Sequence, residues 1–388
     1  MVKFSHLINK LRPLNGKEKV SLNTIEDHVK DPKRLKLIKN LLKNKHISIE
    51  FKKLELTIAE KISYPVIISK AGNVDVSAVN TDIRKAAEET IFKTFSRTAF
   101  EKIPKYIASN ITGMEVAKKA ITLQLFSNQP IHILLLGDPG TGKTDLLRSG
   151  SELSTISSFG LGSGTSGAGL IVTVKGSEII KGIIPQADKG LCCIDELNLM
   201  KEDSRAGLYN AMEKGFVTYD KGGHHYRFDA RVKVLATANP RGDRFKGATI
   251  DELKKELPFD SALLTRFHLI FFIRKPDFKR FREIADKIVS GNKLNINKAD
   301  KEFIKDYVDY TNKIEKVDFP KEQQKEVVDF VAQIKKYEKD HLIEVSPRLV
   351  IGIMRLCKAL AKMELRNIVE KRDITRVKEI VKKSLKIE

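Results

Sequence analysis

The stretch Ile131 to Leu136, IHILLL, runs directly into Gly137 to Thr144, GDPGTGKT. The apolar run predicts a buried strand and Asp145 to Arg148 opens a predicted helix, so the second stretch occupies a strand-to-helix junction. It matches the phosphate-binding pattern G-x-x-x-x-G-K-[ST], whose glycines let backbone N–H groups converge on phosphate oxygens at the positive end of a helix. We therefore expect a nucleoside triphosphate site; the alternative is a glycine turn without nucleotide.

Two side chains of this loop have distinct expected roles. Lys143 is expected to reach the β- and γ-phosphates, and the Thr144 hydroxyl is expected to take one position on Mg²⁺. The expected cofactors are therefore ATP and Mg²⁺. The residues expected to hold them are Gly137, Asp138, Pro139, Gly140, Thr141, Gly142, Lys143, Thr144 and Asp195.

A second apolar run, Leu191 to Glu196 (LCCIDE), predicts a strand that ends in two acids. After a phosphate loop, Asp195 suits the Walker B role of holding Mg²⁺, and Glu196 is the candidate that polarises the attacking water. The alternative is a pair of helix-capping acids. Asn239, at the end of VLATAN, is a candidate for orienting that water, or else a turn residue.

Two arginines are further catalytic candidates. Arg266 in LLTRF precedes the last predicted core strand, where ring ATPases often place an arginine that completes the neighbouring subunit's site. Arg348 in VSPRLV opens a predicted helix behind Ser346-Pro347 and is a candidate γ-phosphate contact. Position alone leaves a non-catalytic role equally open for each.

Composition sets the broad class of the protein. The chain has 388 residues, 41% hydrophobic and 31% charged, which excludes a disordered or a membrane protein. No apolar run approaches the roughly 20 residues of a spanning helix, and the N-terminal residues have no apolar signal core, so we expect a cytosolic protein. Its three cysteines form no C-x-x-C pair. The net charge of +21 indicates a polyanionic partner, nucleic acid before membrane, or alternatively a lysine- and glutamate-rich surface.

The order of patterns predicts an α/β fold. Strand patterns at 131–136, 191–196, 232–239 and 269–273 alternate with helical patterns, and the chain is largely helical beyond Pro276. This order predicts a P-loop core with a parallel sheet, followed by a C-terminal helical lid. Two hairpins are expected, about Lys175-Gly176 and about 220–223. The segment 157–169 is rich in glycine and serine.

The N-terminal hundred residues carry no catalytic motif. They show helical spacing at 34–42 and 83–95 and a strand-like alternation at 47–56. The composition of 70–80 indicates a flexible joint. We therefore expect three domains: a small, mainly helical one at 1–100, the α/β ATPase core at 101–276 and the helical lid at 277–388.

Several segments resemble the AAA+ core of the minichromosome maintenance (MCM) replicative helicases. They are GDPGTGKT (Walker A), SSFGLGSGTSGAGLIVTV followed by IIPQADKGLCCIDEL (helix-2 insert and Walker B), GLYNAMEKGFVTYDKGG (the helix before the presensor-1 hairpin), ATANP (sensor 1), LPFDSALLTRFHLIF (arginine finger) and SPRLVIGIMRLCKALAKMELRNIV (sensor-2 lid helix). The similarity covers roughly residues 105 to 388. RLKLIKNLLKNKHISIEFKKLEL is more faintly similar to the family's small N-terminal helical subdomain.

The resemblance implies a hexameric, ATP-driven DNA translocase or helicase of DNA replication. Arg266 and Arg348 would then reach a neighbour's nucleotide. The residues that would act on the subunit's own nucleotide are Lys143, Thr144, Asp195, Glu196 and Asn239. The implied partners are DNA, further copies of the chain and a full-length MCM protein, with no membrane, in the nucleoid of an archaeal-type cell.

The two hairpins of the resembling family grip DNA phosphates in a central channel. The matching candidates in this chain are Lys175, Lys181 and Lys221. For these lysines, the alternative is an exposed turn position without a DNA contact.

The sequence also departs from the family pattern. There is no room between the N-terminal match and the ATPase core for the family's OB-fold with its zinc ribbon, and no winged-helix domain follows Glu388, so we expect a shortened form. Leu197-Asn198-Leu199 replaces the family's Phe-Asp-Lys after Walker B. TRFH, at 265–268, replaces SRFD.

Two other functions stay open at this point. A MoxR- or McrB-like remodelling ATPase would share the helix-2 insert and hairpin layout, although Ser346 to Val369 favours MCM. The chain is alternatively a non-helicase accessory subunit that modulates a full-length helicase ring.

Overall fold

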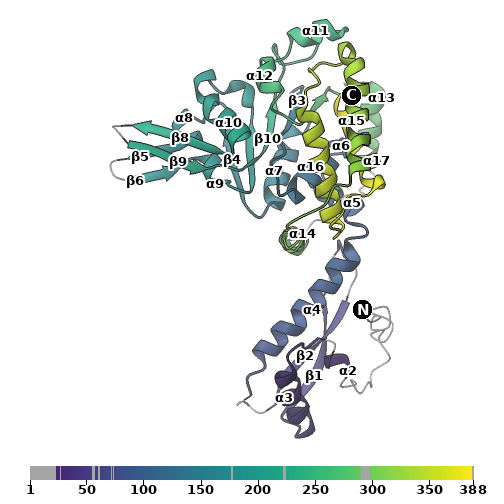
Figure 1. Cartoon of the computed structure of the whole chain (residues 1–388). Coiled ribbons are helices and arrows are strands. Elements are labelled where there is room, and N and C mark those ends of the chain that lie inside the picture. The colour runs from purple at the N-terminus through teal and green to yellow at the C-terminus, as the bar shows by residue number, and fades with distance from the viewer. Residues whose placement is uncertain are drawn as a thin grey trace. The chain divides into compact units, whose positions relative to one another are not determined.

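The computed structural model describes residues 23–26, 28–54, 57–59, 62–70, 72, 74–175, 178–221, 224–289 and 298–386 (Figure 1). The chain divides into two compact units, Met1–Thr98 and Ala99–Glu388. In these described ranges, no helix combines the length and the apolar composition that crossing a membrane requires.

The N-terminal unit packs helices against an antiparallel hairpin. Its elements are α2 (Asn23–Glu26), α3 (Pro32–Lys43), β1 (Ile47–Leu54), β2 (Ile62–Ser69) and α4 (Ser77–Phe95). Asp31 caps α3 by accepting a hydrogen bond from Lys33 N at 2.9 Å. Asn80 fixes α4 to β2, because its side chain accepts from Ile67 N and donates to Ile67 O, both at 2.8 Å.

Two features of this unit differ from expectation. Strand β2 was not expected, since its central Pro65 removes a backbone donor and weakens the strand pattern. Helix α4 begins at Ser77, inside the segment 70–80 that composition suggested as a flexible joint. The N-cap is Val76, which makes no side-chain capping hydrogen bond, so no capping residue marks this start in the sequence.

The C-terminal unit is built on a five-stranded parallel sheet, the predicted α/β core. Its strands are β3 (Ile133–Gly137), β4 (Ser157–Leu161), β7 (Leu191–Asp195), β10 (Lys233–Ala238) and β11 (Leu269–Ile273), in the order β11-β3-β10-β7-β4. Every residue of β3, β7, β10 and β11 is buried, as expected for strands covered on both faces. Edge strand β4 was missed, because Gly160 and two serines mask its alternation.

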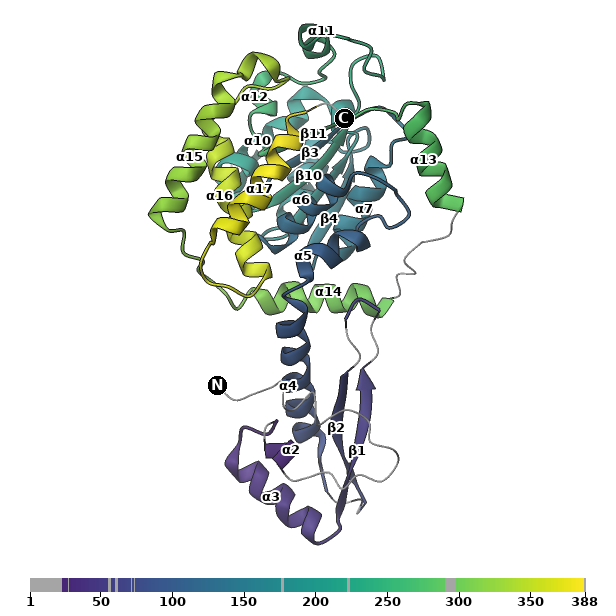
Figure 2. The ribbon, with the colours of Figure 1, turned by 90° about the vertical axis from the view of Figure 1, so that its right-hand side faces the viewer.

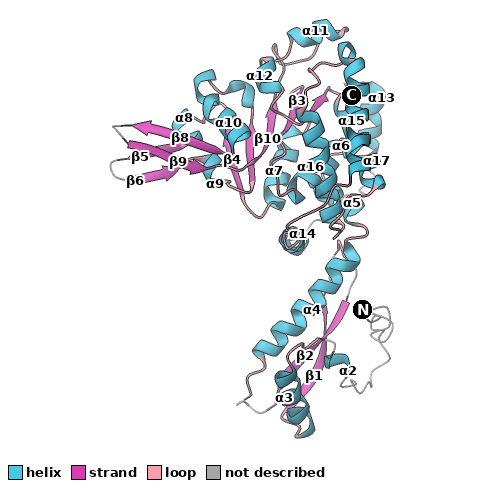
Figure 3. Ribbon diagram, viewed as in Figure 1, coloured by secondary structure: helices cyan, strands magenta, loops and turns pink. Residues whose placement is uncertain are grey.

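Helices cover both faces of this sheet (Figures 2 and 3). Helix α7 (Lys143–Leu153) contacts β4, β7 and β10, and α6 (Glu115–Phe126) packs beside it. On the opposite face, Leu208, Ala211 and Met212 of α10 (Glu202–Lys214) share a core with Leu134 and Leu136. The shorter helices are α5 (Ala99–Lys102), α8 (Gly167–Leu170), α9 (Ile183–Gln186), α11 (Ile250–Lys255) and α12 (Ser261–Leu264).

Two β-hairpins project together from one end of the core (Figure 1). One pairs β5 (Val172–Lys175) with β6 (Glu178–Lys181), and the other pairs β8 (Phe216–Lys221) with β9 (His224–Asp229). Both were expected at these positions. A hollow between them is lined by Lys181, Pro185, Asp188, Arg227, Phe228 and Asp229.

The C-terminal segment is helical, as predicted for a lid. Its helices are α13 (Phe278–Val289), α14 (Lys298–Thr311), α15 (Lys321–Lys336), α16 (Arg348–Met363) and α17 (Lys371–Ser384). Helix α16 packs on α6 and α17, and α17 contacts β11, which joins lid and core. Within the lid, Arg366 donates two hydrogen bonds to the buried carboxylate of Asp373, at 2.9 and 2.6 Å.

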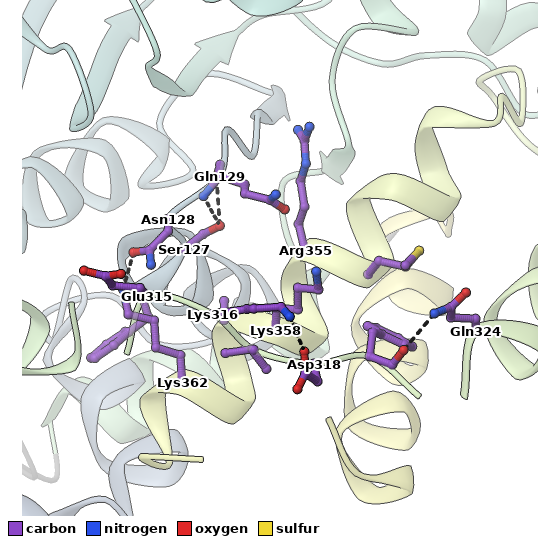
Figure 4. A pocket seen from close by; sticks show the side chains of 15 residues that line it. Ser127, Asn128, Gln129, Glu315, Lys316, Asp318, Gln324, Arg355, Lys358 and Lys362 are labelled. Atoms are coloured by element: carbon purple, nitrogen blue, oxygen red, sulfur yellow. Dashed lines mark hydrogen bonds and ion pairs between the residues drawn. The ribbon is translucent and has the colours of Figure 1, made fainter. Parts of the chain in front are cut away.

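A cavity of about 330 Å³ lies at the seam between α6, α16 and the loop before α15 (Figure 4). Lys362 lines it and donates hydrogen bonds to Asn128 and Asn312, thereby joining core to lid. Burial, with repulsion from Lys233, lowers the pKa of Lys362 to about 7. The neighbouring Lys233 donates to Leu125 O at 3.1 Å, and burial lowers its pKa to about 8.

A buried histidine pair lies at the N-terminal ends of β3 and β11. The rings of His132 and His268 lie 5.1 Å apart, and His268 Nδ1 accepts from His132 N at 3.0 Å. His132 Nδ1 accepts from Val234 N at 3.2 Å. Burial, with repulsion from Arg355 and Arg348, lowers the pKa of His132 to about 3, and burial also lowers the pKa of His268 well below its usual range. Both imidazoles are therefore neutral in the fold at pH 7.

These neutral histidines predict acid sensitivity. Below pH 6.5 the unfolded chain protonates both imidazoles while the folded chain does not, so the free energy of unfolding should fall as pH drops from 6.5 towards 4.5. Each histidine should contribute a slope of up to about 1.4 kcal/mol per pH unit. Denaturant melts of wild type and His132→Asn, each referenced to its own stability at pH 8, measure this slope. An equal slope in the two proteins would contradict the prediction.

Candidate nucleotide site

The phosphate loop joins the end of β3 to the start of α7. Gly142 is the N-cap of α7 with φ +86°, a left-handed conformation that favours glycine. Gly137 lies against β11, so a Cβ placed there would come within 2.0 Å of Ile273 O. The loop is therefore tight on one side and presents the N-terminus of an eleven-residue helix on the other.

Lys143 is buried and folds back over the loop. Its Nζ donates to Gly137 O and to Asp138 O, each at 2.7 Å. Burial lowers the pKa of Lys143 to about 8, partly offset by the nearby carboxylates of Asp138, Asp195 and Glu196. An ammonium held by two neutral carbonyls can exchange these partners for phosphate oxygens, which would stabilise its charge more strongly.

Asp138 uses its carboxylate inside the protein. Its Oδ1 accepts from Phe245 N and its Oδ2 accepts from Lys275 N, each at 2.9 Å. Asp138 N in turn donates to Ile273 O at 2.9 Å, and Thr141 Oγ1 donates to Asp138 O at 2.8 Å. Its side chain thus ties the phosphate loop to two other segments, and its backbone N–H and carbonyl oxygen are also hydrogen-bonded within the protein.

Asp195 stands at the end of β7, next to the loop. Its Oδ1 accepts from Thr144 Oγ1 at 3.2 Å and also from Thr237 Oγ1 on β10. The carboxylate of Asp195 and the hydroxyl of Thr144 are hard oxygen donors of the kind that Mg²⁺ prefers, so these residues fit the expected metal. Thr237 was missed by the sequence analysis, and its only signal is a hydroxyl within an otherwise apolar strand.

Glu196 and Asn239 are positioned by partners of the same neighbourhood. Glu196 has a left-handed backbone with φ +52°, and its N–H donates to Thr237 Oγ1 at 2.9 Å. Asn239 N donates to Asn198 Oδ1 at 3.0 Å. Asn198, one of the departures from the family pattern, therefore accepts the hydrogen bond that an aspartate at that position would also accept.

The two candidate arginines lie together. Arg266 follows α12 and Arg348 opens α16, yet both contact the carboxylate of Glu213 on α10. Among the described residues, neither has a hydrogen bond or ion pair to the phosphate loop of its own chain. The structure thus brings together Lys143, Thr144, Asp195, Glu196 and Asn239 at one edge of the sheet, and the two arginines elsewhere.

The hairpin lysines are only partly described. Lys181 is exposed at the end of β6, whereas the side chains of Lys175 and Lys221 lie outside the described part of the chain. Arg227 on β9, which the sequence analysis did not single out, lies over the ring of Phe216 at 3.9 Å and lines the hollow beside Lys181.

Comparisons with known proteins match the chain to two family models. A family model described as the MCM P-loop domain matches residues 87–292, and one described as the MCM AAA-lid domain matches residues 302–385. The chain is 31% identical over 304 residues to DNA replication licensing factor MCM4 of Arabidopsis thaliana, covering 71% of this chain and 36% of that protein. It is 29% identical over 342 residues to the minichromosome maintenance protein MCM of Saccharolobus solfataricus, covering 81% and 50%.

A third relative is DNA replication licensing factor mcm5 of Dictyostelium discoideum, 36% identical over 231 residues, with 54% of this chain and 30% of that protein covered. The chain thus spans 30% to 50% of the length of these three relatives. Because the matched P-loop domain alone accounts for more than half of its residues and the lid follows in register, the chain belongs to the minichromosome maintenance family.

Proposed function

We propose that this chain is an MCM-like AAA+ ATPase that hydrolyses ATP to translocate on or unwind DNA, as an oligomeric ring, in DNA replication. The observation that carries the proposal is the meeting of Thr144, Asp195 and Thr237 beside the buried ammonium of Lys143. The names of the relatives, which include replication licensing factors, support the biological setting. The nucleoid of an archaeal-type cell is the expected location.

In this proposal each group has one chemical role. Lys143 and the loop N–H groups bind the phosphates, and Thr144 with Asp195 hold Mg²⁺, which neutralises phosphate charge when bound. Glu196 accepts the proton of the attacking water, and Asn239 orients that water. Glu196 adopts a left-handed backbone conformation directly after the strand that ends at Asp195.

A ring is supported by the separation of the arginines from their own phosphate loop. We propose that Arg266 and Arg348 complete the nucleotide site of a neighbouring copy, in a hexamer. The hairpins β5–β6 and β8–β9, which project from one end of the core, would then face DNA. The lysines proposed to contact its phosphates are Lys175, Lys181 and Lys221.

The alternatives differ in their support. A MoxR- or McrB-like remodeller is disfavoured, because the match to the MCM lid extends through residues 302–385. An accessory role beside a full-length MCM protein is the remaining alternative. The two roles are separated by whether the chain alone turns over ATP.

The first test is the ATPase rate with and without single-stranded DNA. Glu196→Gln and Arg266→Ala should each be inactive alone. The first lacks the general base of its own site, and the second supplies no arginine to the site of the neighbouring copy. A one-to-one mixture should recover activity at the interfaces that pair two intact groups. Wild-type turnover no higher than that of Lys143→Ala would overturn the enzymatic proposal and favour the accessory subunit.

A second prediction concerns Thr237. Replacing it with valine keeps the shape but removes the hydroxyl that donates to Asp195 and accepts from Glu196 N. We expect kcat to fall about tenfold or more, the equivalent of about 1.4 kcal/mol for the lost hydrogen bonds. Thr237→Ser, which keeps the hydroxyl, is the matched control. Equal losses in the two variants would contradict the role of the hydroxyl, because Thr237→Ser keeps it.

A third prediction concerns the DNA contact. Lys221→Ala should weaken single-strand binding and lower the slope of log affinity against log salt by about 0.7 per lost phosphate contact. Lys336→Ala, an exposed lysine on α15, should leave the slope unchanged. Fluorescence anisotropy titrations at several salt concentrations measure both. The same slope for Lys221→Ala and wild type would show that Lys221 does not contact DNA phosphates.

A further inference from the structure

One carboxylate joins the two arginines to each other. Glu213 Oε2 lies 3.1 Å from Arg266 Nη2, and Glu213 Oε1 lies 3.7 Å from Arg348 Nη2. The three residues come from α10, from the turn after α12 and from the start of the lid helix α16. The carboxylate of Glu213 offsets the repulsion between the two guanidiniums.

The guanidinium of Arg266 is held on several sides. Its Nη1 donates to Ala262 O, its plane lies over the ring of Tyr209 at 4.8 Å, and its Nε is buried without a hydrogen-bond partner. Tyr209 and Glu213 are four residues apart on α10, so they present one face to this arginine. The side chain of Arg266 is only 20% exposed, and its Nη2 is the donor that contacts Glu213. Glu213 therefore fixes the direction of Nη2.

Arg348 is held more loosely. Its side chain is 33% exposed, and Glu213 is the one carboxylate that contacts it among the described residues. The carboxylate of Glu213 is itself 48% exposed, so the cluster is open to solvent. Two arginines and one glutamate leave a net charge of +1, which can receive a further anion such as a phosphate.

We propose that Glu213 is a positioning residue for ATP hydrolysis that acts in trans: it orients Arg266 and Arg348 towards the phosphates in the neighbouring copy. This inference rests on the proposed function. Glu213 itself touches no nucleotide. Removing its charge leaves the phosphate loop of its own subunit intact and releases the two arginines from their common anchor.

The test uses Glu213→Gln in the full chain. Misplacing a reacting group by about 1 Å costs about a hundredfold. We therefore expect kcat to fall between about tenfold and a hundredfold, with affinity for a fluorescent ADP analogue unchanged. Glu202→Gln, an exposed acid in the first turn of the same helix, is the matched control and should keep wild-type kcat. Wild-type kcat in Glu213→Gln would overturn the proposal.

Mixtures then decide how Glu213 acts. With Glu196→Gln, the variant Glu213→Gln should recover activity, because its own site is intact and its partner supplies well-placed arginines. Mixed with Arg266→Ala, Glu213→Gln should recover no activity, because neither variant supplies a well-placed Arg266 to its neighbour.

Two failures are distinguishable. If Glu213→Gln does not recover activity with Glu196→Gln, or does recover it with Arg266→Ala, the carboxylate serves the fold or its own site and the inference is wrong. If the reference mixture of Glu196→Gln with Arg266→Ala stays inactive, the proposed trans role of Arg266 fails first.

Discussion

The arrangement at the carboxyl-terminal edge of the sheet depends on the hydrogen bonds that the carboxylate of Asp195 accepts. This carboxylate is buried at the end of β7, where an unpaired charge would be costly. It accepts hydrogen bonds from Thr144 on α7 and from Thr237 on β10. Thr237 also receives the N–H of Glu196, so one hydroxyl sets the positions of both acids. The parallel order of the strands brings these groups together, because the carboxyl ends of β3, β7 and β10 meet at one edge.

The sequence contained enough to place the phosphate loop, the acids, four core strands and the lid, because each rests on a local pattern. Strand β4 could not be predicted from the sequence, because its serine and glycine residues are typical of a loop. Its strand conformation depends on pairing with β7. Thr237 was missed for a different reason. A single hydroxyl in an apolar strand becomes informative only when the strand order brings it against Asp195.

The link between Arg266 and Glu213 shows the same limit. These residues are 53 positions apart, and nothing local pairs them. Helix and strand patterns report which face of an element is buried, but they do not report which charged groups from separate elements meet at its rim. Such pairs follow from tertiary packing alone.

The departures from the family pattern are accommodated by similar chemistry. Asn198 keeps an oxygen that accepts from Asn239 N. His268, in place of an aspartate, packs against His132 and receives its N–H instead of remaining as a buried charge. Arg355 donates to Pro130 O, and its Nη1 lies 3.2 Å from Nε2 of the neutral His268 imidazole.

The carboxylate of Asp138 has a mechanical consequence. By accepting from both Phe245 N and Lys275 N, it fastens the phosphate loop to the segment after Asn239 and to the chain that leaves β11 for the lid. These hydrogen bonds hold the three segments together at one carboxylate. The chain becomes exposed at Lys275, and Phe278 then begins α13.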